Sequence, residues 1–414
     1  MVLVSLLLTI VFILFMVSKK VNLGLSLFLN SLLLLLLNSN NPFDIIRIII
    51  DTLKSPVTIN LLLAVTFISI LSSFMNNYSI LDKMVDSLEG VLRSVKATIL
   101  ITPPLMGLLL VSGGALLSAP VIENLGDRLG LEKDKSAAIN MVFRHGLYFV
   151  YPLSTTIILT STLAGFGIFE FISYMWPTAL VIYIIGYWVF LRGVKDVRAD
   201  KTTLKAYLLN LLKFIIYSLP LSLSIFITIY FKLALYKSIV IGLIVAIIIH
   251  QLEMVFKKRQ KGDKSILQIA KEGLNYRMII TLLGMFVFKG AVNSLDGVSV
   301  ALMNVLDNGI PIELIIISSA MLLAFATGSI QPAVALLVPM IIPITSDGET
   351  QILYSVLIYT SGFVGYFISP MHMCQVVTCE YFSISTRQIY KYYKYILPPS
   401  YLVTLIVYFL IMYM

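Results

Sequence analysis

The sequence predicts an all-α polytopic membrane protein. Hydrophobic residues make up 59% of the 414 residues and charged residues only 12%, and the mean hydropathy is +0.96. Soluble domains are about half apolar and about a quarter charged, so a soluble chain of this size could not bury so much apolar surface. The apolar runs are continuous rather than alternating, which favours membrane helices over an outer-membrane barrel.

Stretches of about 20 apolar residues are long enough to cross a bilayer as helices. The first of them, Met1–Ser18, is predicted to be an uncleaved span, because Lys19 and Lys20 follow it where a signal peptide would carry charge before it. The ten predicted spans are 2–18, 20–38, 58–76, 136–164, 173–191, 206–230, 236–256, 277–294, 351–385 and 396–413.

Two further apolar segments, 97–123 and 311–345, contain too many helix breakers for lipid-exposed spans. Backbone N–H and C=O groups that a breaker frees have no water to bond with in the bilayer. The breakers of the first segment are Pro103, Pro104, Gly113, Gly114 and Pro120, and those of the second are Gly328, Pro332 and Pro339. Interrupted segments at matching places in two halves predict re-entrant hairpins at a transporter's substrate site.

The positions of basic residues predict the orientation of the chain. Basic loops follow the predicted spans at 19–20, 192–205, 257–264 and 387–394. If both hairpins re-enter without crossing, all four loops lie in the cytoplasm, as the positive-inside rule requires. Both termini then lie outside a plasma membrane, the first hairpin enters from the cytoplasm, and the second enters from outside. Residues 1–200 and 201–414 therefore form two inverted repeats.

Two short, similar sequences, one in each half, support this division. Tyr148–Pro152 reads YFVYP, and Tyr366–Pro370 reads YFISP. The hairpin tips correspond at nearly the same offset, as Ser-Gly-Gly at 112–114 and Thr-Gly-Ser at 327–329. Pro152 and Pro370 also predict that spans 136–164 and 351–385 are broken helices.

The tips and breaks supply the candidate substrate ligands. Exposed N–H groups and helix N-termini suit an anion, whereas unwound carbonyl groups suit Na⁺. The alternative is that small residues allow close helix packing and that hydroxyl groups satisfy the backbone. The substrate candidates are Ser112, Gly113, Gly114, Ser154, Thr155, Thr156, Thr327, Gly328, Ser329 and His372, with Na⁺ possible at Ser112, Gly113, Thr327 and Gly328.

Arg144 is a further candidate for binding the substrate, because it lies well inside span 136–164. A guanidinium group is costly in lipid and should face a cavity, a carboxylate or an anionic ligand. The corresponding residue in the second half is Gly362, so the charge is not repeated. A structural pair with Glu380 and snorkelling to the interface are the alternatives.

Few other titratable groups lie at membrane depth. His145, His372 and Glu380 are the candidate proton carriers, and Lys289 is a second intramembrane cation. The two cysteines, Cys374 and Cys379, are too few for a disulfide framework, and no Cys/His motif has metal-binding spacing. The sequence therefore predicts no metal site and no cofactor other than a coupling ion.

The segment 79–96 places apolar residues on one face and charged residues on the other, which predicts an amphipathic helix before the first hairpin. The segment 296–309 occupies the same place before the second.

The order of two opposed hairpins, each followed by a broken span, resembles the ion transporter superfamily, which includes gluconate permeases, divalent anion/sodium symporters, and citrate and arsenite carriers. The resemblance covers nearly the whole chain. It implies a scaffold and a moving transport domain, a homodimer and elevator-type motion. Sodium–dicarboxylate symporters carry Ser-Asn-Thr at their tips, where this chain has Ser112-Gly113-Gly114 and Thr327-Gly328-Ser329.

Together these patterns predict a secondary active transporter of a small anion, such as a carboxylate or sugar acid, coupled to H⁺ or Na⁺. A cation/H⁺ antiporter and an inorganic-oxyanion efflux carrier are alternatives on the same architecture. An intramembrane enzyme is more remote, since no catalytic motif is evident. The net charge of +9 lies mainly in loops, so it predicts a topology signal and no nucleic-acid partner.

Overall fold

The structure is a computed structural model, which describes all residues except 1–4, 6, 7, 10, 14, 17, 18, 20, 39–41, 109–114, 199–202, 257–263, 296–308, 346 and 414. Throughout the described residues the regular elements are helices, apart from one isolated bridge between Ser94 and Arg198. The predicted all-α class is confirmed. The described helices that are long and apolar enough to cross a membrane are Pro56–Asn77, Ile168–Phe190, Leu204–Tyr230, Leu235–Met254 and Thr386–Tyr413.

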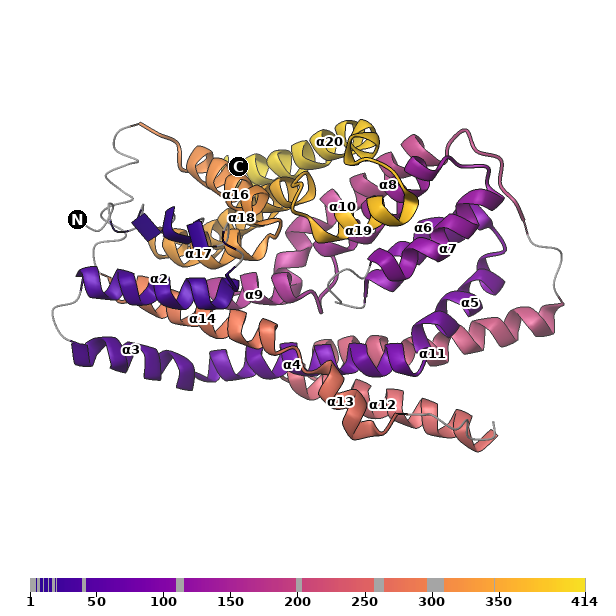
Figure 1. Cartoon of the computed structure of the whole chain (residues 1–414), viewed down its shortest axis with the longest axis horizontal. Coiled ribbons are helices and arrows are strands. Elements are labelled where there is room, and N and C mark those ends of the chain that lie inside the picture. Colours follow the sequence, from indigo (N-terminus) through magenta and orange to yellow (C-terminus); the bar gives the residue numbers. More distant parts are fainter. Residues whose placement is uncertain are drawn as a thin grey trace.

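Eight helices form what we call the outer group, along the lower side of Figure 1. In this group α2 packs on α14, α4 on α12, and α5 on α11. The first contact is very close, because a Cβ added to Gly284 would lie 2.0 Å from the carbonyl oxygen of Gly24. The members are α2 (Leu23–Asn38), α3 (Pro42–Lys54), α4 (Pro56–Asn77), α5 (Ile80–Leu92), α11 (Leu204–Tyr230), α12 (Leu235–Phe256), α13 (Ile266–Gly273) and α14 (Tyr276–Asn293).

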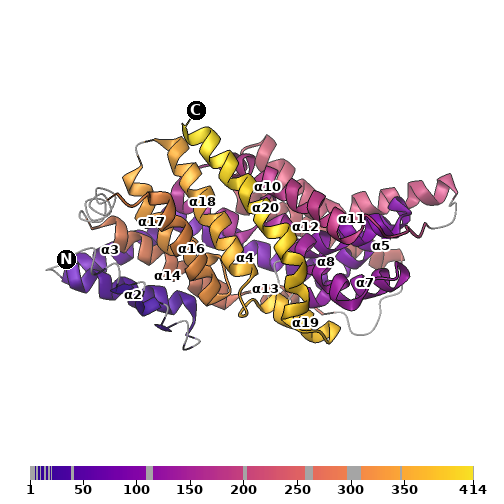
Figure 2. The ribbon, with the colours of Figure 1, turned by 90° about the horizontal axis from the view of Figure 1, so that it is seen from above.

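The remaining helices form the inner group, which lies above the outer group in Figure 1 and is seen from above in Figure 2. Its core contains α16 packed on α18 and α10 packed on α20. The members are α6 (Val95–Gly107), α7 (Ala115–Arg128), α8 (Lys133–Gly146), η1 (Leu147–Phe149), α9 (Thr155–Ala164), α10 (Ile168–Phe190), α16 (Ile312–Thr327), α17 (Gln331–Ile341), η2 (Ile342–Ile344), α18 (Gly348–Phe367), α19 (Met373–Phe382) and α20 (Thr386–Tyr413).

Each predicted hairpin is a pair of packed helices, α6 with α7 and α16 with α17. The tip of the first, 109–114, lies outside the described residues, whereas the second turns at Gly328 in the left-handed region, with φ +64°. One expectation was wrong in detail. Pro103, Pro104 and Pro120 lie within α6 and α7 and do not end them.

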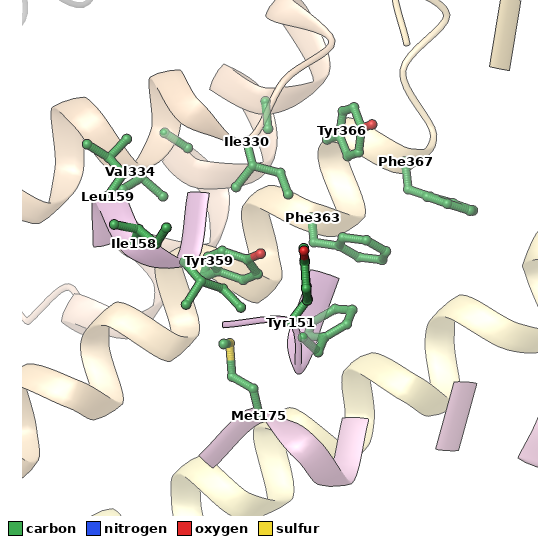
Figure 3. Close-up of a cluster of buried hydrophobic side chains, with 14 of the residues drawn as sticks. Tyr151, Ile158, Leu159, Met175, Ile330, Val334, Tyr359, Phe363, Tyr366 and Phe367 are labelled. Carbon is green, nitrogen blue, oxygen red and sulfur yellow. The ribbon is translucent and has the colours of Figure 1, made fainter. Parts of the chain in front are cut away.

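Both predicted helix breaks are present. Between α8 and α9 the chain forms η1 and then a turn that contains Pro152. Between α18 and α19 the chain leaves the helix after Phe367, and the connection contains Pro370. Buried hydrophobic side chains, among them Tyr151 and Phe367, lie around the two breaks (Figure 3). The rings of Phe149 and Phe363 lie 4.6 Å apart between centroids.

Several contacts between a helix of the first half and a helix of the second half occur twice, with the equivalent helices of the two halves interchanged. The arm α7 packs on α19, and the arm α17 packs on α9. In the outer group α4 packs on α12 while α14 packs on α2, and α13 packs on α4 while α3 packs on α14. Each hairpin thus places its second arm on the post-break helix of the opposite half.

Several boundaries differ from the sequence-based spans. Two short helices, α3 and α13, were not predicted, and α20 begins at Thr386 rather than near residue 396. Both missed helices are amphipathic, so neither forms a continuous apolar run. In α3 the run is interrupted by four charged residues, Asp44, Arg47, Asp51 and Lys54. The amphipathic helix predicted at 79–96 is present as α5. Most of the segment 296–309, and much of span 2–18, lie outside the described residues.

Candidate functional site

A cleft of about 360 Å³ lies at the tip of the second hairpin. The hairpin contributes Thr327, Gly328, Ser329, Gln331 and Pro332 to its lining. The opposite wall comes from the start of α2 and of α14, through Asn22, Asn275, Arg277, Met278 and Thr281. The cleft therefore lies between the inner group and the outer group.

Local backbone chemistry forms the tip. Gly328 is the C-cap of α16 and adopts the left-handed conformation that favours glycine. The Thr327 hydroxyl donates to the Leu323 carbonyl at 2.7 Å, and the Gln331 N–H donates to the Ser329 hydroxyl at 3.3 Å. Since α17 begins at Gln331, the positive end of its dipole lies at the cleft.

The second helix break supports this tip from behind. The Ser369 hydroxyl donates to the Phe325 carbonyl at 2.5 Å and accepts from the Met371 N–H at 3.1 Å. A Cβ on Gly328 would lie 2.6 Å from the Met371 carbonyl oxygen. Met371 and Met373 extend the cleft wall. Hairpin and break thus form one packed unit, as a site at a helix interruption requires.

The cleft is electropositive. Arg277 is exposed and belongs to the lining, and no aspartate or glutamate is among the described residues that line the cleft. Asn22, Asn275, Ser329 and Gln331 add neutral hydrogen-bonding groups. A guanidinium group, amide and hydroxyl donors and a helix N-terminus together suit the binding of a carboxylate or another oxyanion.

A buried polar cluster lies next to this unit. The Nε2 atoms of His145 and His372 are 3.2 Å apart, and His145 Nε2 lies 3.1 Å from the Tyr366 hydroxyl. The Tyr148 and Tyr366 rings stack at 6.3 Å between centroids, with 9° between their planes. The cluster joins α8 to the break between α18 and α19, which are far apart in the sequence.

Arg144 lies on α8, where it packs against α6 of the first hairpin, and it is not among the described residues that line the cleft. Only 4% of the residue is exposed, and its Cγ lies 3.1 Å from the position that a Cβ on Gly107 would take. The candidates Ser112, Gly113 and Gly114 lie outside the described residues. Each hairpin therefore has an arginine beside one of its described parts, Arg144 at the end of α6 and Arg277 at the tip of the second hairpin.

The other candidates take varied positions. Ser154, Thr155 and Thr156 are buried at the start of α9, and the described lining of the cleft does not include them. Glu380 is exposed on α19, so it lacks the buried environment of the two histidines. Lys289 donates to the Leu163 carbonyl at 2.8 Å, and so contacts the C-terminal end of α9.

Sequence reasoning missed Arg277, Asn22 and Asn275, because each lies at the end of an apolar run and looks like an ordinary interfacial residue. It also missed Asn140, which is fully buried, donates to the Ala115 carbonyl at 3.0 Å and accepts from the Ser118 hydroxyl at 2.6 Å. The signal that could have found Asn140 is a polar amide inside a predicted span.

The fold defines a class of polytopic helical membrane proteins built from paired hairpins and broken helices. Within that class the chain belongs to the family described as protein of unknown function, DUF401, which matches residues 1–413. The fold is similar to that of the YdaH transporter of Alcanivorax borkumensis, whose crystal structure is described as having an unusual topology. The TM-score is 0.61 at 14% identity, over 96% of this chain and 97% of that one. A comparison with curated proteins finds no matching relative.

Proposed function

We propose that the protein is a secondary active transporter of a small anion, with an organic acid such as a carboxylate or a sugar acid as substrate. The observation that carries this proposal is the cleft at the second hairpin. There Arg277, the polar tip residues and the start of α17 face one space that no described acidic residue lines. The similarity to the fold of a solved transporter supports the transport class.

The proposed orientation follows the basic loops. Arg277 begins α14 shortly after the basic stretch 257–264, so the cleft would open to the cytoplasm. Both termini would lie outside a plasma membrane. The second hairpin would then re-enter from outside and present its tip to a cytoplasmic cleft, which corresponds to an inward-facing state.

We further propose that the halves are inverted repeats, in the arrangement of the ion transporter superfamily. The exchanged contacts support this, since α7 on α19 and α17 on α9 are the same contact with the halves interchanged. The stacking of Tyr148 on Tyr366 supports it as well. These two tyrosines are the first residues of the similar sequences Tyr148–Pro152 and Tyr366–Pro370.

The division into two groups supports an elevator-type mechanism. The inner group would carry the cleft residues of the hairpin, and the outer group would remain as scaffold. Contacts between the groups involve short segments, such as α14 with α17 and α4 with α9. Outer-group helices α11 and α12 expose large apolar side chains, including Leu208, Leu212, Ile244 and Ile248, which suits contact with lipid or with a second subunit in a homodimer.

The proposal is tested by reconstituting the purified protein in liposomes and measuring the uptake of carboxylates, sugar acids, inorganic oxyanions and monovalent cations. Each substrate is measured with and without imposed Na⁺ and pH gradients. Saturable uptake of an organic anion that one gradient drives is the expected result. Cation exchange against H⁺ without anion flux would instead identify an antiporter and contradict the proposal.

A further inference from the structure

The two buried histidines have a third neighbour with metal-binding chemistry. His145 Nε2 or Nδ1, His372 Nε2 or Nδ1 and the Cys374 sulfur provide three ligand atoms that all lie within 4.8 Å of one another. His145 and His372 are 0% and 1% exposed, and Cys374 is partly buried. The three residues come from α8, from the residue before α19, and from the first turn of α19.

The hydrogen bond on the far side of His145 fixes its tautomer. Its Nδ1 lies 2.7 Å from the Met141 carbonyl oxygen, which can only accept, so Nδ1 carries the proton. The lone pair therefore lies on Nε2, which faces His372 Nε2 at 3.2 Å. An imidazole that donates one N–H to a backbone carbonyl and presents the other nitrogen is the usual arrangement of a metal-binding histidine.

The separation of the two nitrogens fits a shared ion. Zn–N distances of about 2.0–2.1 Å place two nitrogens of a tetrahedral site about 3.3 Å apart, close to the 3.2 Å observed. Cys374 lies in the first turn of α19, two residues after His372. Its sulfur lies within 4.8 Å of the histidine ligand atoms.

The cluster lies beside the cleft wall. Met371 and Met373 line the cleft, and His372 lies between them in sequence but is buried against His145. The backbone that forms part of the cleft wall therefore also positions His372 in the buried cluster. The cluster offers imidazole nitrogens and a sulfur as ligands. Such a ligand set selects transition metals over Na⁺, Mg²⁺ or Ca²⁺, which prefer oxygen.

We propose that His145, His372 and Cys374 form a binding site for a transition-metal ion of borderline or soft character, with Zn²⁺ and Cu⁺ as the matching ions. The bound ion joins α8 in the first half to the helix break in the second half, and so holds the inner group together at its centre. Three protein ligands leave one coordination position for water or an anion.

The test measures metal binding by the full-length protein in detergent after removal of metal with a chelator. Zn²⁺ binding is followed by competition with a chromophoric chelator, Cu⁺ binding by the same method under reducing conditions, and Co²⁺ binding by its absorption spectrum. We expect one high-affinity ion per chain, a thiolate-to-cobalt charge-transfer band, and a rise in melting temperature on addition of Zn²⁺.

Matched variants separate this site from adventitious binding. Cys374→Ser should remove the charge-transfer band, and His372→Gln should weaken binding roughly 10-fold or more. Cys379→Ser, which changes the other cysteine, and His250→Gln, which changes the histidine stacked on Tyr78, should bind as the wild type does. Because Cys374→Ser is nearly isosteric, it should keep the metal-free melting temperature while losing the Zn²⁺-induced rise. A wild-type protein that binds neither Zn²⁺ nor Cu⁺, or a Cys374→Ser His372→Gln double variant that binds both unchanged, would overturn the proposal.

Discussion

Gly328 at the tip of the second hairpin lies against the carbonyl of Met371 in the second helix break, where an added Cβ would be 2.6 Å from the oxygen. This contact joins the hairpin to the broken helix. Both segments line the cleft with Arg277, so the shape of the candidate anion site depends on how closely these two backbones approach.

Gly328→Ala should therefore lower stability in two ways. A left-handed backbone costs an alanine about 1–2 kcal/mol, and the clash with Met371 adds an overpacking cost of about 1–3 kcal/mol. Gly165→Ala is the matched control, because Gly165 also has a positive φ but would place its Cβ in open space. Thermal unfolding in detergent should show a larger loss for Gly328→Ala; equal losses would show that the contact is unimportant.

Asn140→Ala should destabilise the first hairpin. The change removes two buried hydrogen bonds, one to the Ala115 carbonyl and one from the Ser118 hydroxyl, and leaves these two groups only their mutual bond of 3.2 Å. Each lost hydrogen bond contributes about 0.5–1.5 kcal/mol to stability. Ser118→Ala keeps the bond between Asn140 and the Ala115 carbonyl and should cost less. Unfolding temperatures in detergent compare the two variants, and a neutral Asn140→Ala would contradict the account of this contact.

Lys289→Met should weaken the contact between the outer group and the inner group. Lys289 in the outer group donates to the carbonyl of Leu163 at the end of α9 in the inner group, and a cation at a helix C-terminus contributes about 0.3–1 kcal/mol. Lys237→Met, at an exposed position on α12, is the control. If the groups slide past one another, we expect Lys289→Met to change the transport rate while Lys237→Met does not. Identical rates in both variants would mean that this contact does not resist the motion.

The proposed topology predicts opposite labelling for two loops. Single cysteines at Glu132 and Glu349, which are exposed, are placed in a protein that lacks Cys374 and Cys379. A membrane-impermeant thiol reagent applied to intact cells should label the cysteine at 349 and not the one at 132. Labelling of both positions from the same side would reject the inverted arrangement of the hairpins.

The two helix breaks and the tip of the second hairpin were predictable from the sequence. Pro152 and Pro370 indicated the helix breaks, and Gly328 indicated the hairpin tip, because proline and glycine change the backbone at their own position. The proline pair in α6 was less informative, since tertiary packing holds a helix through Pro103 and Pro104. Local backbone chemistry therefore located the second hairpin better than the ends of the first.

The site itself was only partly predictable. Thr327, Gly328 and Ser329 line the cleft, but Arg277 faces them from α14, and no local pattern indicates that proximity. The same holds for His145, which meets His372 and Cys374 only because α8 packs on α19. Motif searches depend on spacing along the chain, whereas these groups come together across the two halves of the fold.

The central claim is that the electropositive cleft binds the transported anion, and Arg277 tests it most directly. Arg277→Gln removes the positive charge but keeps hydrogen-bonding capacity, and Lys271→Gln removes an exposed charge on α13 that does not line the cleft. Initial rates of anion uptake into proteoliposomes are measured over a range of substrate concentrations. We expect Arg277→Gln to raise KM about 10-fold or more, because it removes one charge-assisted hydrogen bond, which contributes about 1.5–3 kcal/mol. Lys271→Gln should leave KM unchanged. An unchanged KM in Arg277→Gln would contradict the claim.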